Sequence, residues 1–89
     1  MRAVLTVVGK DTVGISARVT ALCSNANVNV TEVTQTIQQD LFAMIMMIDL
    51  SESNIPFTRF TEDMSRLGDE MNLKIHVMHE DIFNSMHRI

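Results

Sequence analysis

Residues 41–50, LFAMIMMIDL, are almost wholly apolar, and polar residues stand on either side of them, Asp40 before and Ser51 after. A short apolar run of this kind predicts a strand. Because the residues that would point to each face of the sheet are apolar, the strand is expected in the centre of the sheet. Both of its faces are apolar. The two faces comprise Leu41, Ala43, Ile45 and Met47 on one side and Phe42, Met44, Met46 and Ile48 on the other.

The segment before this run, residues 28–38, alternates and is rich in Val and Thr. It predicts a second strand with much of its surface in water, at an edge of the sheet. Gln39 and Asp40 fall where a tight turn is needed, although they lack the glycine of the strongest hairpin signals.

Two segments have apolar residues at helical spacing. Residues 15–26 predict an amphipathic helix, and a second helix follows residues 51–54, which are polar and can cap it. Pro56 fits an early position of that helix, where its missing N–H does no harm. The apolar stripes are Ile15, Val19, Leu22, Cys23 and Ala26 in the first helix, and Phe57, Phe60, Met64, Leu67 and Met71 in the second.

Residues 3–8 and 73–78 complete the pattern as the first and fourth strands, which right-handed crossovers place side by side. The order β-α-β-β-α-β predicts an α+β, ferredoxin-like plait with a four-stranded antiparallel sheet and two helices on one face. A C-terminal tail, residues 80–89, has one apolar stripe on about two helical turns. So short a helix must pack on something, and we expect it to cover the free face of the sheet, in its own chain or in a partner's.

Composition narrows the class of function. The chain has 89 residues, so we expect a single domain over residues 1–89. A net charge of −4 argues against a nucleic-acid binder. One cysteine cannot form an internal disulfide, and no apolar run is long enough for a signal peptide or a membrane span, so we expect a cytoplasmic protein. A lone domain would expose one apolar face of its central strand, so we expect a stable homodimer.

The loop Gly9-Lys10-Asp11-Thr12-Val13-Gly14-Ile15, the segment Asn27-Val28-Asn29-Val30 and the ending Glu80–Ile89 together resemble the ACT domain, in its small stand-alone form. The resemblance covers essentially the whole chain. It implies a regulatory domain that binds an amino acid or another small metabolite where two domains meet, and that acts on an enzyme or a transcription system. The chain is also similar to the glycine cleavage system repressor, which has two such domains where this chain has one. Asp11 and Asn29 match the family's ligand-contacting positions.

The loop itself suits an amino acid. The free N–H groups at a helix start attract an anion, so a carboxylate would lie near the N–H groups of Val13, Gly14 and Ile15, and Asp11 would accept a hydrogen bond from the ammonium. A purely structural interpretation stands beside this one: Asp11 or Thr12 caps the helix, and Gly14 eases the packing of strand on helix.

Other chemistries fit less well. Three histidines and their neighbouring methionines suggest a metal, but His76 and His79 stand at odd spacing on a strand and point to opposite faces, so we expect no metal and no cofactor. Cys23 has no base near it in the sequence, so we expect an inert thiol and no enzyme activity. The alternative function is a ligand-free dimeric scaffold that docks on an enzyme or a transcription regulator.

Overall fold

One four-stranded sheet organises the molecule, with the strand order β2-β3-β1-β4. A computed structural model describes residues 1–10 and 12–86. The strands are β1 (Arg2–Lys10), β2 (Asn29–Gln38), β3 (Leu41–Asp49) and β4 (Leu73–His79). All three pairings are antiparallel, and β1 and β3 occupy the centre. The predicted central third strand, edge second strand and adjacent first and fourth strands are all confirmed.

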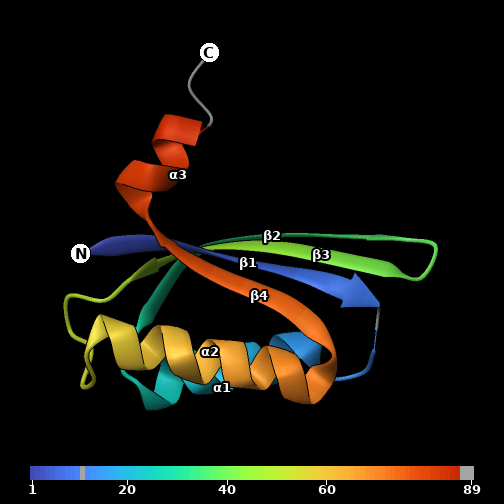
Figure 1. Ribbon diagram of the computed structural model, residues 1–89, viewed down its shortest axis with the longest axis horizontal. Coiled ribbons are helices and arrows are strands. Elements are labelled where there is room, and N and C mark those ends of the chain that lie inside the picture. The colour runs from blue at the N-terminus through green and yellow to red at the C-terminus, as the bar shows by residue number, and fades with distance from the viewer. Residues whose placement is uncertain (11, 87–89) are drawn as a thin grey trace.

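Helices α1 (Ile15–Asn25) and α2 (Phe57–Met71) lie on one face of the sheet, and a short helix, α3 (Glu80–Met86), rises on the other side (Figure 1). The predicted ferredoxin-like plait with a helical tail is therefore confirmed. Residues 87–89 of the tail lie outside the described residues.

The core lies between the sheet and the two long helices. Every second residue of β3 points into it, and these residues are Phe42, Met44, Met46 and Ile48, each at most 4% exposed. They pack with Val19, Phe60 and Met64 from the helices. The alternate residues of β3 face away from α1 and α2, where Leu41 is 51% and Ile45 41% exposed. The two apolar faces predicted for this strand are therefore present, and the face without the long helices remains partly open.

The start of α2 differs from the expectation. No side chain caps this helix in the described structure, and Pro56 precedes its first turn in an extended conformation (φ −64°, ψ 153°). The polar segment has another task, because Ser53 Oγ donates to the carbonyl of Ile55 at 2.8 Å and accepts from its N–H at 3.3 Å. The prediction that residues 51–54 cap α2 was wrong. They stabilise the loop that leads to Pro56. The fixed φ of Pro56 then sets the direction in which the chain enters α2.

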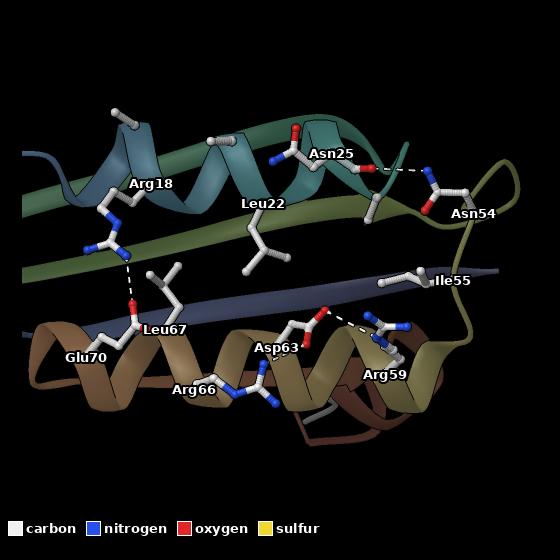
Figure 2. A pocket seen from close by; sticks show the side chains of 13 residues that line it. Arg18, Leu22, Asn25, Asn54, Ile55, Arg59, Asp63, Arg66, Leu67 and Glu70 are labelled. Atoms are coloured by element: carbon white, nitrogen blue, oxygen red, sulfur yellow. Dashed lines mark hydrogen bonds and ion pairs between the residues drawn. The ribbon is translucent and has the colours of Figure 1, made fainter.

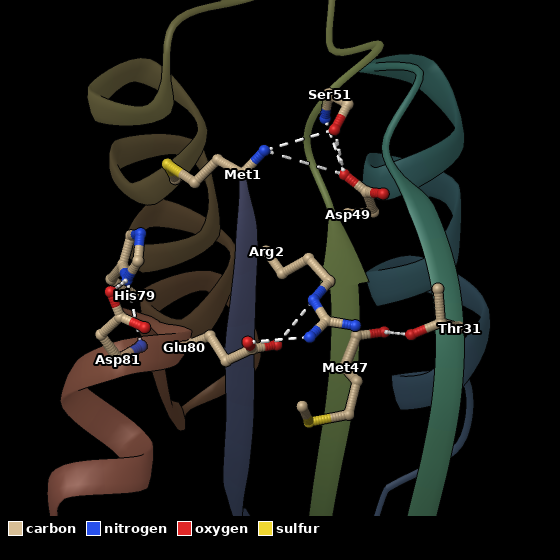
Figure 3. A network of polar contacts seen from close by, with 9 residues as sticks. All are labelled: Met1, Arg2, Thr31, Met47, Asp49, Ser51, His79, Glu80 and Asp81. Atoms are coloured by element: carbon tan, nitrogen blue, oxygen red, sulfur yellow. Dashed lines mark hydrogen bonds and ion pairs between the residues drawn. The ribbon is translucent and has the colours of Figure 1, made fainter.

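The tail covers less of the sheet than expected. Arg2 and Glu80 form an ion pair at the base of α3, with Nε 2.8 Å from Oε2 (Figure 3). Val4, which alternation places on the face away from α1 and α2, is fully buried at this end of the sheet. Val8 on the same strand is still 43% exposed. Within one chain, α3 therefore leaves the far half of this face uncovered.

Candidate functional site

The loop before α1 supplies backbone groups to the candidate site. Gly14 is the N-cap of α1 and adopts φ +90°, a conformation that side-chain-bearing residues rarely take. No side chain caps this helix in the described part of the chain, so capping by Thr12 is not observed. Val13 is fully exposed, and a Cβ on Gly14 would meet no atom of the described residues within 4 Å. The start of α1 therefore faces open space, as an anion-binding helix N-terminus requires.

Two of the predicted loop residues need separate comment. Ile15 is only 2% exposed and belongs to the core, so only its backbone can face a ligand. Asp11 lies outside the described residues, so its predicted contact with an ammonium stays a prediction. In the first turn of α1, Ser16 Oγ donates to Gln35 Oε1 at 3.2 Å, which joins the start of α1 to β2.

Asn29, the one predicted site residue outside the loop, is the first residue of β2. It lines a pocket of about 350 Å³. This volume is at the small end of the range for small-molecule sites. Apolar groups from Cys23, Val28 and Val30 meet hydrogen-bonding side chains there. The remaining lining residues are Thr20, Ser24, Asn27 and Glu52. The pocket thus offers hydroxyl, amide and carboxylate groups beside a small apolar surface.

The loop and the Asn29 pocket stand at opposite ends of α1. Gly14 precedes the first residue of this 11-residue helix, and Asn29 follows its last turn. A helix of that length spans roughly 16 Å, which is more than a free amino acid can bridge. The structure therefore does not bring Gly14 and Asn29 together within one chain.

A second cavity, a groove of about 630 Å³, runs between α1 and α2 on the surface away from the sheet (Figure 2). Leu22, Ile55 and Leu67 line it with apolar surface, and Ala17 and Ala21 keep the α1 wall low. Small residues on one wall and large apolar ones between the helices leave room for another chain or a ligand with an apolar body.

The groove is edged with charge. Arg18 of α1 reaches across it to Glu70 of α2, with Nη2 2.8 Å from Oε2. Arg59 and Arg66 share one carboxylate, Asp63, at 4.0 and 3.3 Å. Three of the chain's seven Lys and Arg residues thus line this groove beside two acids, although the whole chain has a charge of −4. The groove is a local excess of positive charge on an acidic protein.

Among the residues that line the two cavities, the sequence predicted only Asn29 as part of a site. Thr20 and Ser24 stand four apart on the polar side of the first helix, a spacing that places them on one face. Arg59, Asp63 and Arg66 repeat at i, i+4 and i+7, which also marks one face. Both patterns were visible in the sequence, but neither indicates which neighbour the face meets.

Three further observations limit the kinds of site that the described residues can form. Burial raises the pKa of the Cys23 thiol to about 11, and the side chain is 1% exposed. Over the described residues, no three His, Cys, Asp or Glu side chains gather in a group that could hold a metal ion. None of the helices described is both long enough and apolar enough to cross a bilayer.

Comparison with known proteins gives consistent matches. A family model for the ACT domain matches residues 2–78. A UPF0237 protein of Listeria innocua is 44% identical over 89 residues, covering 100% of both chains. An ACT domain protein from Streptococcus pneumoniae has a TM-score of 0.80 at 31% identity and covers 93% of each chain. A putative glycine cleavage system transcriptional repressor has a TM-score of 0.73 at 27% identity, with 85% of this chain and 43% of that chain covered.

Proposed function

Because this chain belongs to the ACT domain family, we propose that it is a regulatory domain that senses an amino acid or a related small carboxylate at the interface of a homodimer. The family resemblance seen in the loop and in the Asn29 segment is confirmed, and the fold is the regulatory, ligand-binding ACT fold. The loop before α1 and the Asn29 pocket form two half-sites. The observation that carries the proposal is the distance between them, since each chain has both half-sites but cannot bring them together alone.

The edge strand β2 provides a way to join them. In the sheet that the described residues form, its outer edge has no neighbouring strand, and β2 is exposed along nearly its whole length. Val33 and Ile37 are 48% and 52% exposed on the side of β2 that faces α1. Antiparallel pairing of two β2 edges about a two-fold axis would bury these side chains.

The same pairing supports a shared site. Asn29 lies at one end of β2, while Ser16 and Gln35 tie the start of α1 to the other half of the strand. Antiparallel pairing reverses one strand relative to the other, so Asn29 of one copy would approach the start of α1 in its partner. The two half-sites would then face each other twice in each dimer.

The chemistry of the loop half matches the two ends of an amino acid. The N–H groups at Val13, Gly14 and Ile15 suit the carboxylate, and Asp11 suits the ammonium. Asn29 would complete the site from the partner. The proposed role is binding without catalysis, because the thiol of Cys23 is buried and its raised pKa keeps it protonated. We expect this sensor in the cytoplasm.

Isothermal titration against the standard amino acids tests the proposal. A hydrogen bond to a charged group contributes about 1.5–3 kcal/mol, so Asp11→Ala should weaken binding on the order of tenfold to a hundredfold. Asn29→Ala should also weaken it while the dimer persists. Asn84→Ala is the matched control, because Asn84 is exposed on α3 and remote from both halves. If no amino acid binds the unaltered protein at millimolar concentration, the sensor hypothesis fails.

The groove between α1 and α2 favours a second candidate function, a scaffold that docks on an enzyme or a transcription regulator. Its apolar floor and its arginines suit an amphipathic helix with acidic residues along its sides. The double variant Arg59→Glu, Arg66→Glu should abolish binding of such a partner, and Lys74→Glu, on the other side of the sheet, should not. Binding that survives the double variant would exclude this groove.

A further inference from the structure

The face of the sheet away from α1 and α2 has an uncovered apolar patch at the end opposite α3. The patch consists of Val8, Leu41, Ala43 and Ile45, of which Val8 is 43%, Leu41 51% and Ile45 41% exposed. The sheet register places Val8 beside Ala43, and Thr6 beside Ile45, so these side chains form one continuous surface on β1 and β3. Contiguous apolar surface of this kind marks a contact site on a soluble protein.

The base of α3 is attached to the other end of the same face. Arg2 holds Glu80 by two contacts, Nε to Oε2 at 2.8 Å and Nη2 to Oε1 at 2.9 Å (Figure 3). Only 18% of the Glu80 side chain is exposed. This attachment fixes where α3 begins, and Figure 1 shows the helix rising from the sheet rather than lying along it.

The free part of α3 has apolar side chains with little covering. Ile82 is 56% and Met86 67% exposed, and their spacing of four residues places them on one side of the helix. An exposed apolar stripe on a seven-residue helix does not stabilise that helix by itself. The stripe therefore requires a surface that the described residues of its own chain do not give it.

Each chain thus presents an uncovered apolar helix at one end of this face and an uncovered apolar patch at the other. We propose that a second copy of the chain docks face to face, so that α3 of each copy lies across the apolar patch of the other. In a two-fold symmetric pair both α3 stripes and both patches are buried at once, because the stripe of each copy packs on the patch of the other.

Charge on this face agrees with that arrangement. The strands carry Lys10 and Lys74 at the patch end, where Lys10 pairs with Leu41 and Lys74 with Val8 in the register. The α3 end carries Asp81, whose side chain is 85% exposed, and Glu32, which stands opposite Met47. When the two faces meet with their ends reversed, the acidic end of one lies over the lysines of the other.

This contact is separate from the β2-edge contact of the proposed function, since it buries the broad face of the sheet and not its edge. A chain that uses both contacts assembles as a dimer of dimers. The amino-acid half-sites lie beside α1 and β2, so loss of the face contact leaves them unchanged.

Light scattering on the full chain tests the inference. Ile45→Glu should halve the measured molar mass at micromolar concentration, and Met86→Glu should do the same from the other side of the contact. Leu41→Glu, at a more exposed position, gives the same test if Ile45→Glu folds poorly. The conclusion is overturned if these variants keep the mass of the unaltered protein, or if that protein is already a 10.0 kDa monomer.

A charge exchange tests the orientation. Lys74→Glu and Asp81→Lys should each shift the association to higher concentration, and the double variant should restore it, because each chain then presents the opposite pair. Val33→Glu separates the two contacts, since Val33 is an exposed valine on the β2 edge that the face contact does not use. Val33→Glu should weaken amino-acid binding, whereas Ile45→Glu should leave it intact, so the two proposals fail separately. No recovery in the double variant would contradict the reversed stacking.

Discussion

Arg2 and Glu80 are 78 positions apart in the chain and face each other through a two-point contact of guanidinium and carboxylate, at 2.8 and 2.9 Å. The first residue of β1 thereby holds the first residue of α3. This contact joins the two ends of the described chain, and it determines which part of the open sheet face the tail covers.

Arg2→Lys should loosen α3 without unfolding the domain. A lysine keeps the charge but cannot make the two-point contact, and exposed ion pairs contribute only about 0–1 kcal/mol. Hydrogen exchange of the α3 amides should therefore become faster while the melting temperature changes little. Arg66→Lys is the control, because its partner Asp63 lies on the same helix. Unchanged exchange in α3 would show that the contact does not hold the tail.

Gly68→Ala should destabilise the packing of α2 on β4. A Cβ at this position would lie 2.8 Å from the carbonyl oxygen of Leu73 and 3.3 Å from Cγ1 of Ile75. The nearer atom belongs to the backbone, so the strand itself must shift, and overpacking of this kind costs about 1–3 kcal/mol. Urea denaturation measures the loss. Ser65→Ala, on the exposed side of the same helix, should change stability by less than about 0.5 kcal/mol.

Cys23 should behave as a buried apolar group. Its pKa of about 11 leaves on the order of one thiolate in a thousand at pH 8. Thiol reagents should therefore label the folded protein slowly and the urea-unfolded protein quickly. Cys23→Ser should lower the free energy of unfolding by about 1–3 kcal/mol, because it buries a hydroxyl, and Cys23→Ala should lower it less. Fast labelling of the native protein would contradict this prediction.

Asp49 should make the protein sensitive to acid. The Ser51 hydroxyl and then the Ser51 N–H hydrogen-bond to Asp49 Oδ1 at 2.6 and 2.9 Å, and they lower the pKa of this carboxyl below 3.8. A carboxyl with a lowered pKa in the folded state stabilises it above the unfolded pKa and loses that effect as the pH falls through the folded value. Ser51→Ala should therefore reduce the fall in melting temperature below about pH 4. An identical acid profile in the variant would refute the linkage.

The candidate site was predictable only in part. Gly14 stood out because a glycine directly before an amphipathic helix offers both close approach and free N–H groups, and the structure gives it a left-handed backbone. Asn29 was found by resemblance, and the structure adds the pocket around it. Glu52 was not foreseen there, since it comes from a loop more than twenty residues along the chain and nothing in its local pattern indicates the contact.

Local pattern alone determined the elements and their order, because the spacing of apolar residues in a segment reports which of its sides is buried. The continuous apolar run of residues 41–48 and the helical stripe from Phe57 to Met71 fall within the observed strand and helix. What each surface meets was decided only by tertiary structure. Pro56 and not a polar side chain opens α2, Arg2 holds the tail at one end of the sheet, and Gly14 and Asn29 lie a helix length apart. These relations depend on the path of the chain between distant residues, and side-chain spacing within one segment carries no information about that path.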